Sequence, residues 1–207
     1  MVPVNHIEAH VMTPRMIPSL QNKADFPYVS VLVTGGHTEI VLTRGVGLHT
    51  VMGFSIDIAI GSFLDTVAAE IQQRTDIFDD KKQISDFIID YNKKNAHDTI
   101  PDGYFNDILK LPATGKFLER LARYGDPREF EMPIPQKLDS TANMSFSGLQ
   151  SFAKFRFYEK PKGDFKAIYD RDRLPLTFAQ ILNISSSAQF AAFCQVQRKL
   201  QNVIAYL

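Results

Sequence analysis

Three extended runs, separated by glycine turns and followed at once by a helical pattern, limit the fold of this chain more than any other feature. The run Tyr28–Val33 is almost continuously apolar and β-branched, which is typical of a buried strand. Further strands are predicted over Glu39–Arg44 and Leu48–Met52, so this region predicts a β-meander. A helix is predicted from about Ile56 to Gln73, because apolar residues recur there at three- and four-residue steps.

Helical patterns dominate the rest of the chain. Shorter helices are predicted over Gly115–Tyr124 and Gly148–Phe157, and a longer one over Ser186–Leu207. Ser55 is the expected N-cap of the helix that follows the meander. Strands followed by helices predict an α/β or α+β lobe.

Composition excludes several classes of protein. The 207 residues hold 23 Lys plus Arg and 23 Asp plus Glu, a balance that argues against a dedicated nucleic-acid binder but leaves a local basic patch open. The single cysteine, Cys194, excludes a disulfide framework within the chain and suits a reducing compartment or the mitochondrial matrix. No apolar run approaches the roughly 18 residues needed to span a bilayer, so no membrane association is expected.

The pair His6 and His10 is the first candidate for chemistry. Residues i and i+4 share one face of a helix, so both imidazoles could bind one metal ion, whereas Glu8 would point elsewhere. Two histidines do not complete a tetrahedral site, so further ligands would have to come from distant residues. Two surface or capping histidines near a chain end would give the same pattern.

The run Thr34-Gly35-Gly36-His37-Thr38 is the second candidate. Glycine lacks Cβ, so this backbone could approach a phosphate and present its N–H groups, with the threonine hydroxyls as further donors. An ordinary hairpin turn explains the two glycines equally well.

The third candidate combines Asp57, Gly61 and Asp65, which would lie on one stripe of the predicted helix. A glycine within a helix costs about 1 kcal/mol relative to alanine, so Gly61 should permit close packing or the approach of a ligand. The two carboxylates could accept ribose hydroxyls or hold a cation, or they could simply be solvated. A weaker candidate is the Ser145–Gln150 segment, which is typical of a capped helix start that could cover a substrate.

These motifs, taken in order, resemble one family. The segments that carry the resemblance are NHIEAH, FPYVSVLVTGGHTEIVL, GFSIDIAIGSFLDTVA, LPATGKFLERLARYGDP and SFSGLQSF. Together they resemble the tRNA N6-adenosine threonylcarbamoyltransferase family, also known as glycoproteases or O-sialoglycoprotein endopeptidases. The resemblance covers most of residues 3–157 and, more loosely, 184–207. Asp57-Ile58-Ala59, Leu64-Asp65 and FSGLQ look most like the mitochondrial branch.

The resemblance implies an α/β, actin/Hsp70/sugar-kinase-like ATPase fold, with residues 1–26 as the end of a first lobe and 27–207 as the second. It implies an acyltransferase, an N6-L-threonylcarbamoyladenine synthase. This enzyme moves threonylcarbamoyl from threonylcarbamoyl-AMP to N6 of adenosine 37 in tRNAs that read ANN codons. It also implies one divalent metal ion, tRNA as a partner, a possible homodimer, and the mitochondrial matrix as location, with the cytoplasm as runner-up.

The resemblance also assigns site residues. His6 and His10 match the family's metal-binding histidines. The residues that match its nucleotide-binding positions are Leu32, Val33, Thr34, Gly35, Gly36, Asp65 and Gly115. No catalytic acid or base is assigned.

The chain also departs from the family pattern. Ser62 stands where a glutamate is common and Thr66 where a lysine is common, and residues 71–110 form a longer polar stretch that is expected to be a divergent insertion. The family's first lobe precedes the histidine pair, and its last strand, Gly-Gly loop, Asn and metal-binding Asp follow the point that corresponds to Leu207. We therefore expect a fragment with a partial site. The main alternative is a catalytically incomplete, nucleotide-binding relative. A sugar kinase or a chaperone-like ATPase would share the fold, but a fold does not determine a function. A metalloendopeptidase is less favoured, because the sequence contains no His-Glu-x-x-His motif.

Overall fold

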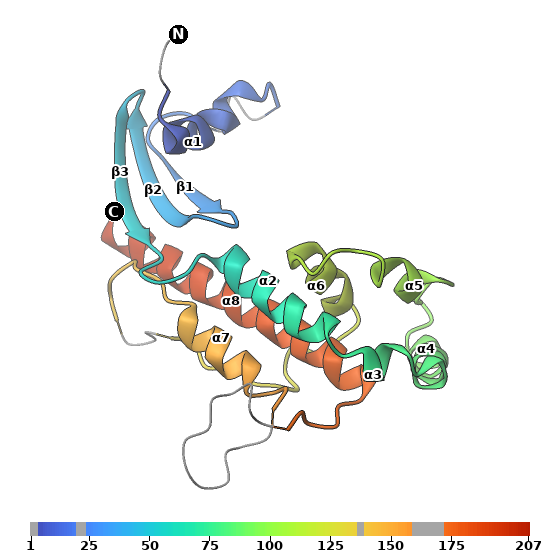
Figure 1. The fold of residues 1–207 in the computed structure, drawn as a ribbon. Helices are drawn as coiled ribbons and strands as arrows, with labels where there is room; N and C mark the ends of the chain where they lie inside the picture. The colour runs from blue at the N-terminus through green and yellow to red at the C-terminus, as the bar shows by residue number, and fades with distance from the viewer. Residues whose placement is uncertain (1–3, 20–23, 136–138, 159–171) are drawn as a thin grey trace, which may run out of the picture.

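The computed structural model describes residues 4–19, 24–135, 139–158 and 172–207, which form a small sheet above a layer of helices (Figure 1). The strands are β1 (Tyr28–Val33), β2 (Thr38–Gly45) and β3 (Leu48–Phe54). The helices are α1 (His6–Met16), α2 (Ile60–Gln72), α3 (Thr75–Phe78), α4 (Lys81–Lys94), α5 (Tyr104–Ile108), α6 (Gly115–Ala122), α7 (Ser147–Lys154) and α8 (Phe178–Tyr206). The described chain is thus a mixed α/β structure with a small antiparallel sheet.

The sheet confirms the predicted meander. Its order is β1-β2-β3, with β1 and β3 both antiparallel to β2. The central strand β2 is the buried one, and its Ile40, Val41 and Leu42 are almost inaccessible to solvent. Because β2 is hydrogen-bonded to β1 on one side and to β3 on the other, this largely β-branched run is stable in the extended form.

The long helix α8 organises the helical layer. It runs diagonally across the molecule, with α2, α6 and α7 packed against it (Figure 1). It begins eight residues earlier than predicted, because Thr177 and Gln180 form a capping box and apolar residues continue from Phe178. Near its other end, Lys199 Nζ donates to the carbonyl oxygens of Asp139 and Thr141, each at 3.1 Å. Among the described residues, no helix is both long and apolar enough to cross a bilayer.

Residues 71–110 form α3, α4 and α5, and their apolar side chains join the same core as α2 and α8. The ring of Phe178 on α8 lies edge-on to Phe78, Phe87 and Phe105, with centroid distances of 6.3, 5.5 and 4.8 Å. These three rings come from α3, α4 and α5, so one side chain of α8 contacts all three helices of the segment.

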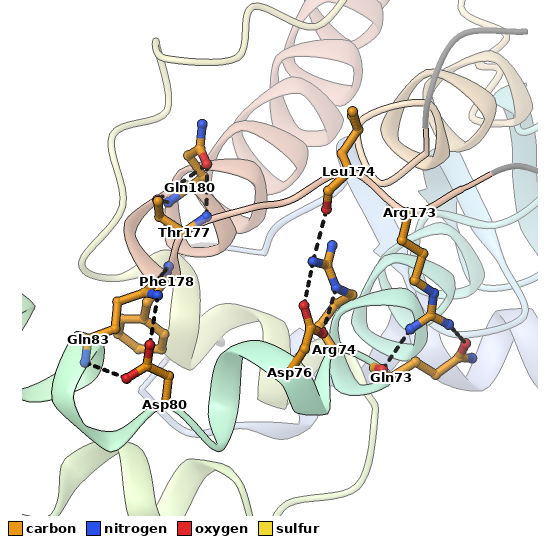
Figure 2. Close-up of polar contacts among 10 residues, drawn as sticks. All are labelled: Gln73, Arg74, Asp76, Asp80, Gln83, Arg173, Leu174, Thr177, Phe178 and Gln180. Carbon is orange, nitrogen blue, oxygen red and sulfur yellow. Dashed lines mark hydrogen bonds and ion pairs between the residues drawn. The ribbon is translucent and has the colours of Figure 1, made fainter. Parts of the chain in front are cut away.

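Polar contacts reinforce this junction, as Figure 2 shows. Arg74, only 2% exposed, donates to both carboxylate oxygens of Asp76 at 3.0 and 2.8 Å and to the carbonyl of Leu174 at 3.0 Å. Arg173 donates to the backbone and side-chain oxygens of Gln73 at 2.8 and 3.0 Å. The segment that enters α8 is therefore fixed to the end of α2.

Candidate functional site

The turn between β1 and β2 is closed by its own first residue. Thr34 N–H donates to the carbonyl of His37 at 2.8 Å, and the Thr34 hydroxyl oxygen accepts from Gly36 N–H at 3.2 Å and His37 N–H at 2.8 Å. The N–H of Gly35 has no hydrogen-bond partner within the described residues. The turn is thus a hairpin connection that keeps one glycine donor uncommitted. Leu32 and Val33 lead into it at the end of β1.

Gly61 brings this turn onto the first turn of α2. A Cβ atom at Gly61 would lie 2.6 Å from the Cα of Gly35 and 2.7 Å from the carbonyl oxygen of Thr34, closer than side chains are found to pack. The Ser62 hydroxyl donates to the carbonyl of Gly35 at 3.0 Å. Ser62 therefore fastens the glycine turn to α2.

Asp65 and Gly115 also meet, although 50 residues separate them. The Gly115 N–H, at the start of α6, donates to Asp65 Oδ1 at 2.7 Å. Asp65 is exposed, and its Oδ2 makes no hydrogen bond within the described ranges. Asp65 follows Gly61 by one helical turn, so both lie on the same side of α2.

The histidine pair lies next to the glycine turn. His6 and His10 occupy successive turns of α1, both are exposed, and their Nε2 atoms are 3.1 Å apart. The ring centroid of His6 is 5.9 Å from that of His37, the residue that follows Gly36. The structure thus places the candidate metal ligands beside the candidate nucleotide loop.

This separation fits a shared metal ion. Two imidazole nitrogens about 2.0–2.1 Å from a tetrahedral metal lie roughly 3.3 Å apart. No group of three His, Cys, Asp or Glu side chains able to hold a metal occurs within the described part of the chain. The two histidines alone could fill only two positions of a tetrahedral shell, so a metal ion bound there would need further ligands.

Glu8 points away from the two histidines, as predicted. Its Oε1 accepts from the Gly47 N–H at 3.0 Å and lies 3.1 Å from His49 Nε2, so it joins α1 to the β2–β3 turn. The hydrogen bond from His49 is the main cause that holds the pKa of Glu8 below its ordinary value. Glu8 thus fixes α1, and with it the histidine pair, relative to the sheet.

Asp57 does not lie on α2, and its predicted stripe with Gly61 and Asp65 is wrong. α2 begins at Ile60, and Asp57 lies in the turn before it. Its carboxylate accepts from the hydroxyls of Ser145 and Ser147, both at 2.6 Å, and from the backbone N–H groups of Ile58, Phe146 and Ser147. Burial opposes ionisation of Asp57, but these hydrogen bonds outweigh it and hold the pKa of the carboxyl well below its ordinary range.

The same contacts explain the Ser145–Gln150 segment. The residue before α7 is Phe146, whose side chain does not cap the helix, and the hydroxyl of Ser147 donates to the Asp57 carboxylate instead. Asp57 therefore joins its own turn to the Ser145–Ser147 segment, which lies nearly ninety residues further along the chain. The sequence analysis did not predict this role, because the only signal for it is the pair of serine hydroxyls on either side of Phe146 that can donate to one carboxylate.

A groove of about 460 Å³ lies between α1 and β1. His10 and Leu32 line it together with Tyr28, whose hydroxyl donates to the carbonyl of Val11 at 2.8 Å. From this groove, the candidate residues follow one another along a strip whose residues are exposed, except for the half-buried Gly61 and Gly115. In order, the strip consists of His10, His6, His37, Gly36, Gly35, Gly61, Ser62, Asp65 and Gly115.

Comparison with known proteins matches the chain to one family model, tRNA N6-adenosine threonylcarbamoyltransferase, over residues 1–206. Relatives that carry this name include proteins of Buchnera aphidicola (31% identical over 164 residues) and Brucella suis (32% over 149). The Afipia carboxidovorans protein is 33% identical over 152 residues. These matches cover 79%, 72% and 73% of the chain and 36%, 30% and 31% of the relatives. The chain thus spans about a third of the length of the curated relatives it matches.

Proposed function

Because the chain belongs to the tRNA N6-adenosine threonylcarbamoyltransferase family, we propose that it serves the transfer of threonylcarbamoyl from threonylcarbamoyl-AMP to N6 of adenosine 37 in tRNAs that read ANN codons. The observation that carries the proposal is the strip from the histidine pair to Asp65 and Gly115. Residues that the resemblance assigns to metal and nucleotide binding, although far apart in the chain, lie next to one another there.

The strip offers a specific way to hold the nucleotide. The free Oδ2 of Asp65 accepts a ribose hydroxyl, as acidic residues do in other nucleotide sites. The uncommitted N–H of Gly35 donates to a phosphate oxygen, and the absence of side chains on Gly35 and Gly36 lets the ligand approach the backbone.

In the transfer, the N6 amine attacks the carbamoyl carbonyl carbon, the new N–C bond forms, and the C–O bond to AMP breaks with its electron pair leaving on the phosphate. The amine then loses one proton to solvent. An aromatic amine is a weak nucleophile, so holding the two reactants in line is the main contribution of the residues in the strip.

A divalent metal ion held by His6 and His10 would polarise the oxygens of the adenylate. The chain's own contribution is the orientation of the two rings. Asn5 caps the helix through hydrogen bonds from Ile7 and Glu8 N–H, and Glu8 fastens the helix to the β2–β3 turn.

The motif resemblance is the basis of finer proposals. We propose an actin-like ATPase fold in which residues 1–26 belong to a first lobe and 27–207 to a second, with 71–110 as a family-divergent insertion. We also propose that the protein is located in the mitochondrial matrix, which imaging of the tagged protein tests. We further propose that it forms a homodimer, which the molar mass from sedimentation-equilibrium ultracentrifugation tests.

Binding of AMP tests the nucleotide site directly. We expect Asp65→Asn to weaken AMP binding about tenfold in isothermal titration calorimetry, since one charge-assisted hydrogen bond to ribose is worth about 1.4 kcal/mol or more. The matched control is Asp86→Asn, an exposed aspartate of α4, which should bind AMP as the wild type does. Equal affinity for all three proteins would refute the nucleotide site.

Nucleoside mass spectrometry of tRNA incubated with the protein, threonylcarbamoyl-AMP and a divalent metal tests the transfer itself. Modified adenosine that disappears with His6→Ala/His10→Ala supports the proposal. AMP binding without any modified adenosine would favour a nucleotide-binding relative that does not carry out the reaction alone.

A further inference from the structure

Three cations lie on one face of α6 and its C-cap. Lys116, Arg120 and Arg123 are spaced by four and three residues, so they share a side of the helix, and all are exposed. They line an open cavity of about 500 Å³ together with Tyr104 and Gln189. We call these five residues the α6 patch.

The charge of the patch is only partly neutralised. Arg123 pairs with Asp98 at 3.3 Å and lies over the ring of Tyr124 at 5.5 Å. Within the described ranges, the side chains of Lys116 and Arg120 make no ion pair or hydrogen bond, although Glu119 also lines the cavity. Two cations thus face solvent in a chain whose total formal charge is zero.

The patch continues the strip described above. Lys116 follows Gly115, whose N–H is bound to Asp65, so the first cation of the patch is one residue from the nucleotide site. The Tyr104 hydroxyl donates to the carbonyl of Arg120 at 3.1 Å, which joins α5 to α6 beside the cavity that both residues line.

We propose that the α6 patch binds the phosphodiester backbone of the RNA whose adenosine reacts at the adjacent strip, an inference that rests on the proposed function. Arginine, lysine, glutamine and tyrosine are among the side chains that contact phosphate oxygens in nucleic-acid complexes, and such contacts position the nucleic acid without reading its sequence. An acidic protein partner would also be attracted to the cations, but it would not explain their continuity with a nucleotide site.

Binding of fluorescein-labelled, unmodified tRNA, measured by fluorescence anisotropy at several salt concentrations, tests the proposal. Lys116→Gln/Arg120→Gln should weaken binding on the order of tenfold near 0.1 M salt. It should also lower the slope of log affinity against log salt by about 1.4–1.8, since each lost phosphate contact contributes about 0.7–0.9. Glu119→Gln should strengthen binding, because it removes the anion from the cavity.

The matched control is Lys82→Gln/Lys93→Gln, which removes two exposed cations of α4 that do not line the cavity. AMP affinity and melting temperature are recorded for every variant, so that loss of fold or of the nucleotide site is recognised. If the wild type binds tRNA and the patch variant binds equally well with the same salt slope, the patch is refuted and the proposed function stands. If the wild type binds no tRNA, both are refuted. Polyglutamate that displaces tRNA from the wild type at lower concentration than unlabelled tRNA would assign the patch to an acidic protein instead.

Discussion

At the scale of single residues, Gly61 allows the glycine turn to pack directly against α2, because no space is left there for a side chain. Alanine normally stabilises a helix relative to glycine by up to about 1 kcal/mol. At Gly61 the added Cβ would meet backbone atoms of Gly35 and Thr34 at 2.6–2.7 Å, and backbone cannot rotate away as a flexible side chain can. We therefore expect Gly61→Ala to lower the melting temperature and to weaken AMP binding at least about threefold, which corresponds to ~0.65 kcal/mol.

Gly148 is a matched control, because it is also the second residue of its helix and a Cβ there would have only Pro135 Cγ nearby, at 3.9 Å. Gly148→Ala should leave the melting temperature unchanged or raise it slightly. A Gly61→Ala protein as stable as this control, with unaltered AMP affinity, would show that the contact between turn and helix is unimportant.

Asp57 predicts a dependence of stability on pH. Its pKa in the folded protein lies below the value of about 3.9 expected in the unfolded chain. Its contribution to the free energy of unfolding is therefore complete above about pH 5 and is lost as the pH falls through about 4 toward the folded-state pKa. At pH 7, Asp57→Asn should lower the free energy of unfolding by about 1–2 kcal/mol, a modest amount because the side chain is exposed.

Urea unfolding of wild type and Asp57→Asn between pH 3 and pH 7 measures this difference. The difference between their free energies of unfolding should become smaller as the pH falls. A constant difference over the whole pH range would mean that the ionised carboxylate is not what joins the two segments.

At the scale of elements, α1 depends on Glu8 for its position against the sheet. Removing the carboxylate in Glu8→Ala deletes the acceptor of both the Gly47 N–H and His49. We expect amide hydrogen exchange in α1 to become several-fold faster, because among the described residues the helix is otherwise held mainly through Tyr28, Arg15 and the buried Val11.

Asp25→Asn is the control for this prediction. Asp25 also pairs with α1, through Arg15, but at 3.7 Å and with 82% of its side chain exposed, so its loss should leave exchange in α1 almost unchanged. If Glu8→Ala behaves like Asp25→Asn, the bridge to the β2–β3 turn does not position the histidine pair.

The elements differ in how far the sequence could predict them. The strands and the start of α6 at Gly115 follow from local patterning and were predicted well. The start of α2 was placed too early, because Ile56 and Ile60 keep a helical spacing although Ala59 between them is extended. That turn is held by the hydrogen bonds that the Asp57 carboxylate accepts from the hydroxyls of Ser145 and Ser147, and such distant partners cannot be found from local periodicity.

The start of α8 was missed for a different reason. Its signal is local, since Thr177 and Gln180 match the pattern of a capping box, but it follows a stretch of mixed prolines and charges that resembles a loop. For the candidate site, the resemblance supplied the residues, while the structure supplied their neighbours. The contacts of His6 with His37 and of Ser62 with Gly35 depend on tertiary packing that no spacing rule contains.

At the scale of the whole molecule, Phe178 joins the long helix α8 to residues 71–110. Its ring is fully buried among aromatic rings of α3, α4 and α5. Phe178→Ala should lower the free energy of unfolding by about 3–5 kcal/mol, the usual cost of a cavity left by a core phenylalanine. Chemical denaturation followed by circular dichroism measures the loss.

Phe190, on the same helix but 55% exposed, provides the comparison, and Phe190→Ala should change the free energy of unfolding by no more than about 1 kcal/mol. A Phe178→Ala protein that is as stable as Phe190→Ala would show that α4 and α5 attach to the rest of the molecule by other means.

The length of α8 itself carries a consequence. Its 29 residues extend for roughly 44 Å, with Phe178 seated among the aromatic rings at one end and Lys199 bound to the carbonyls of Asp139 and Thr141 toward the other. One residue inserted between these two attachments would turn everything beyond it by about 100° and carry Lys199 off its acceptors. The number of residues between the two attachments is therefore fixed, so during evolution this stretch can accept substitutions far more readily than insertions or deletions.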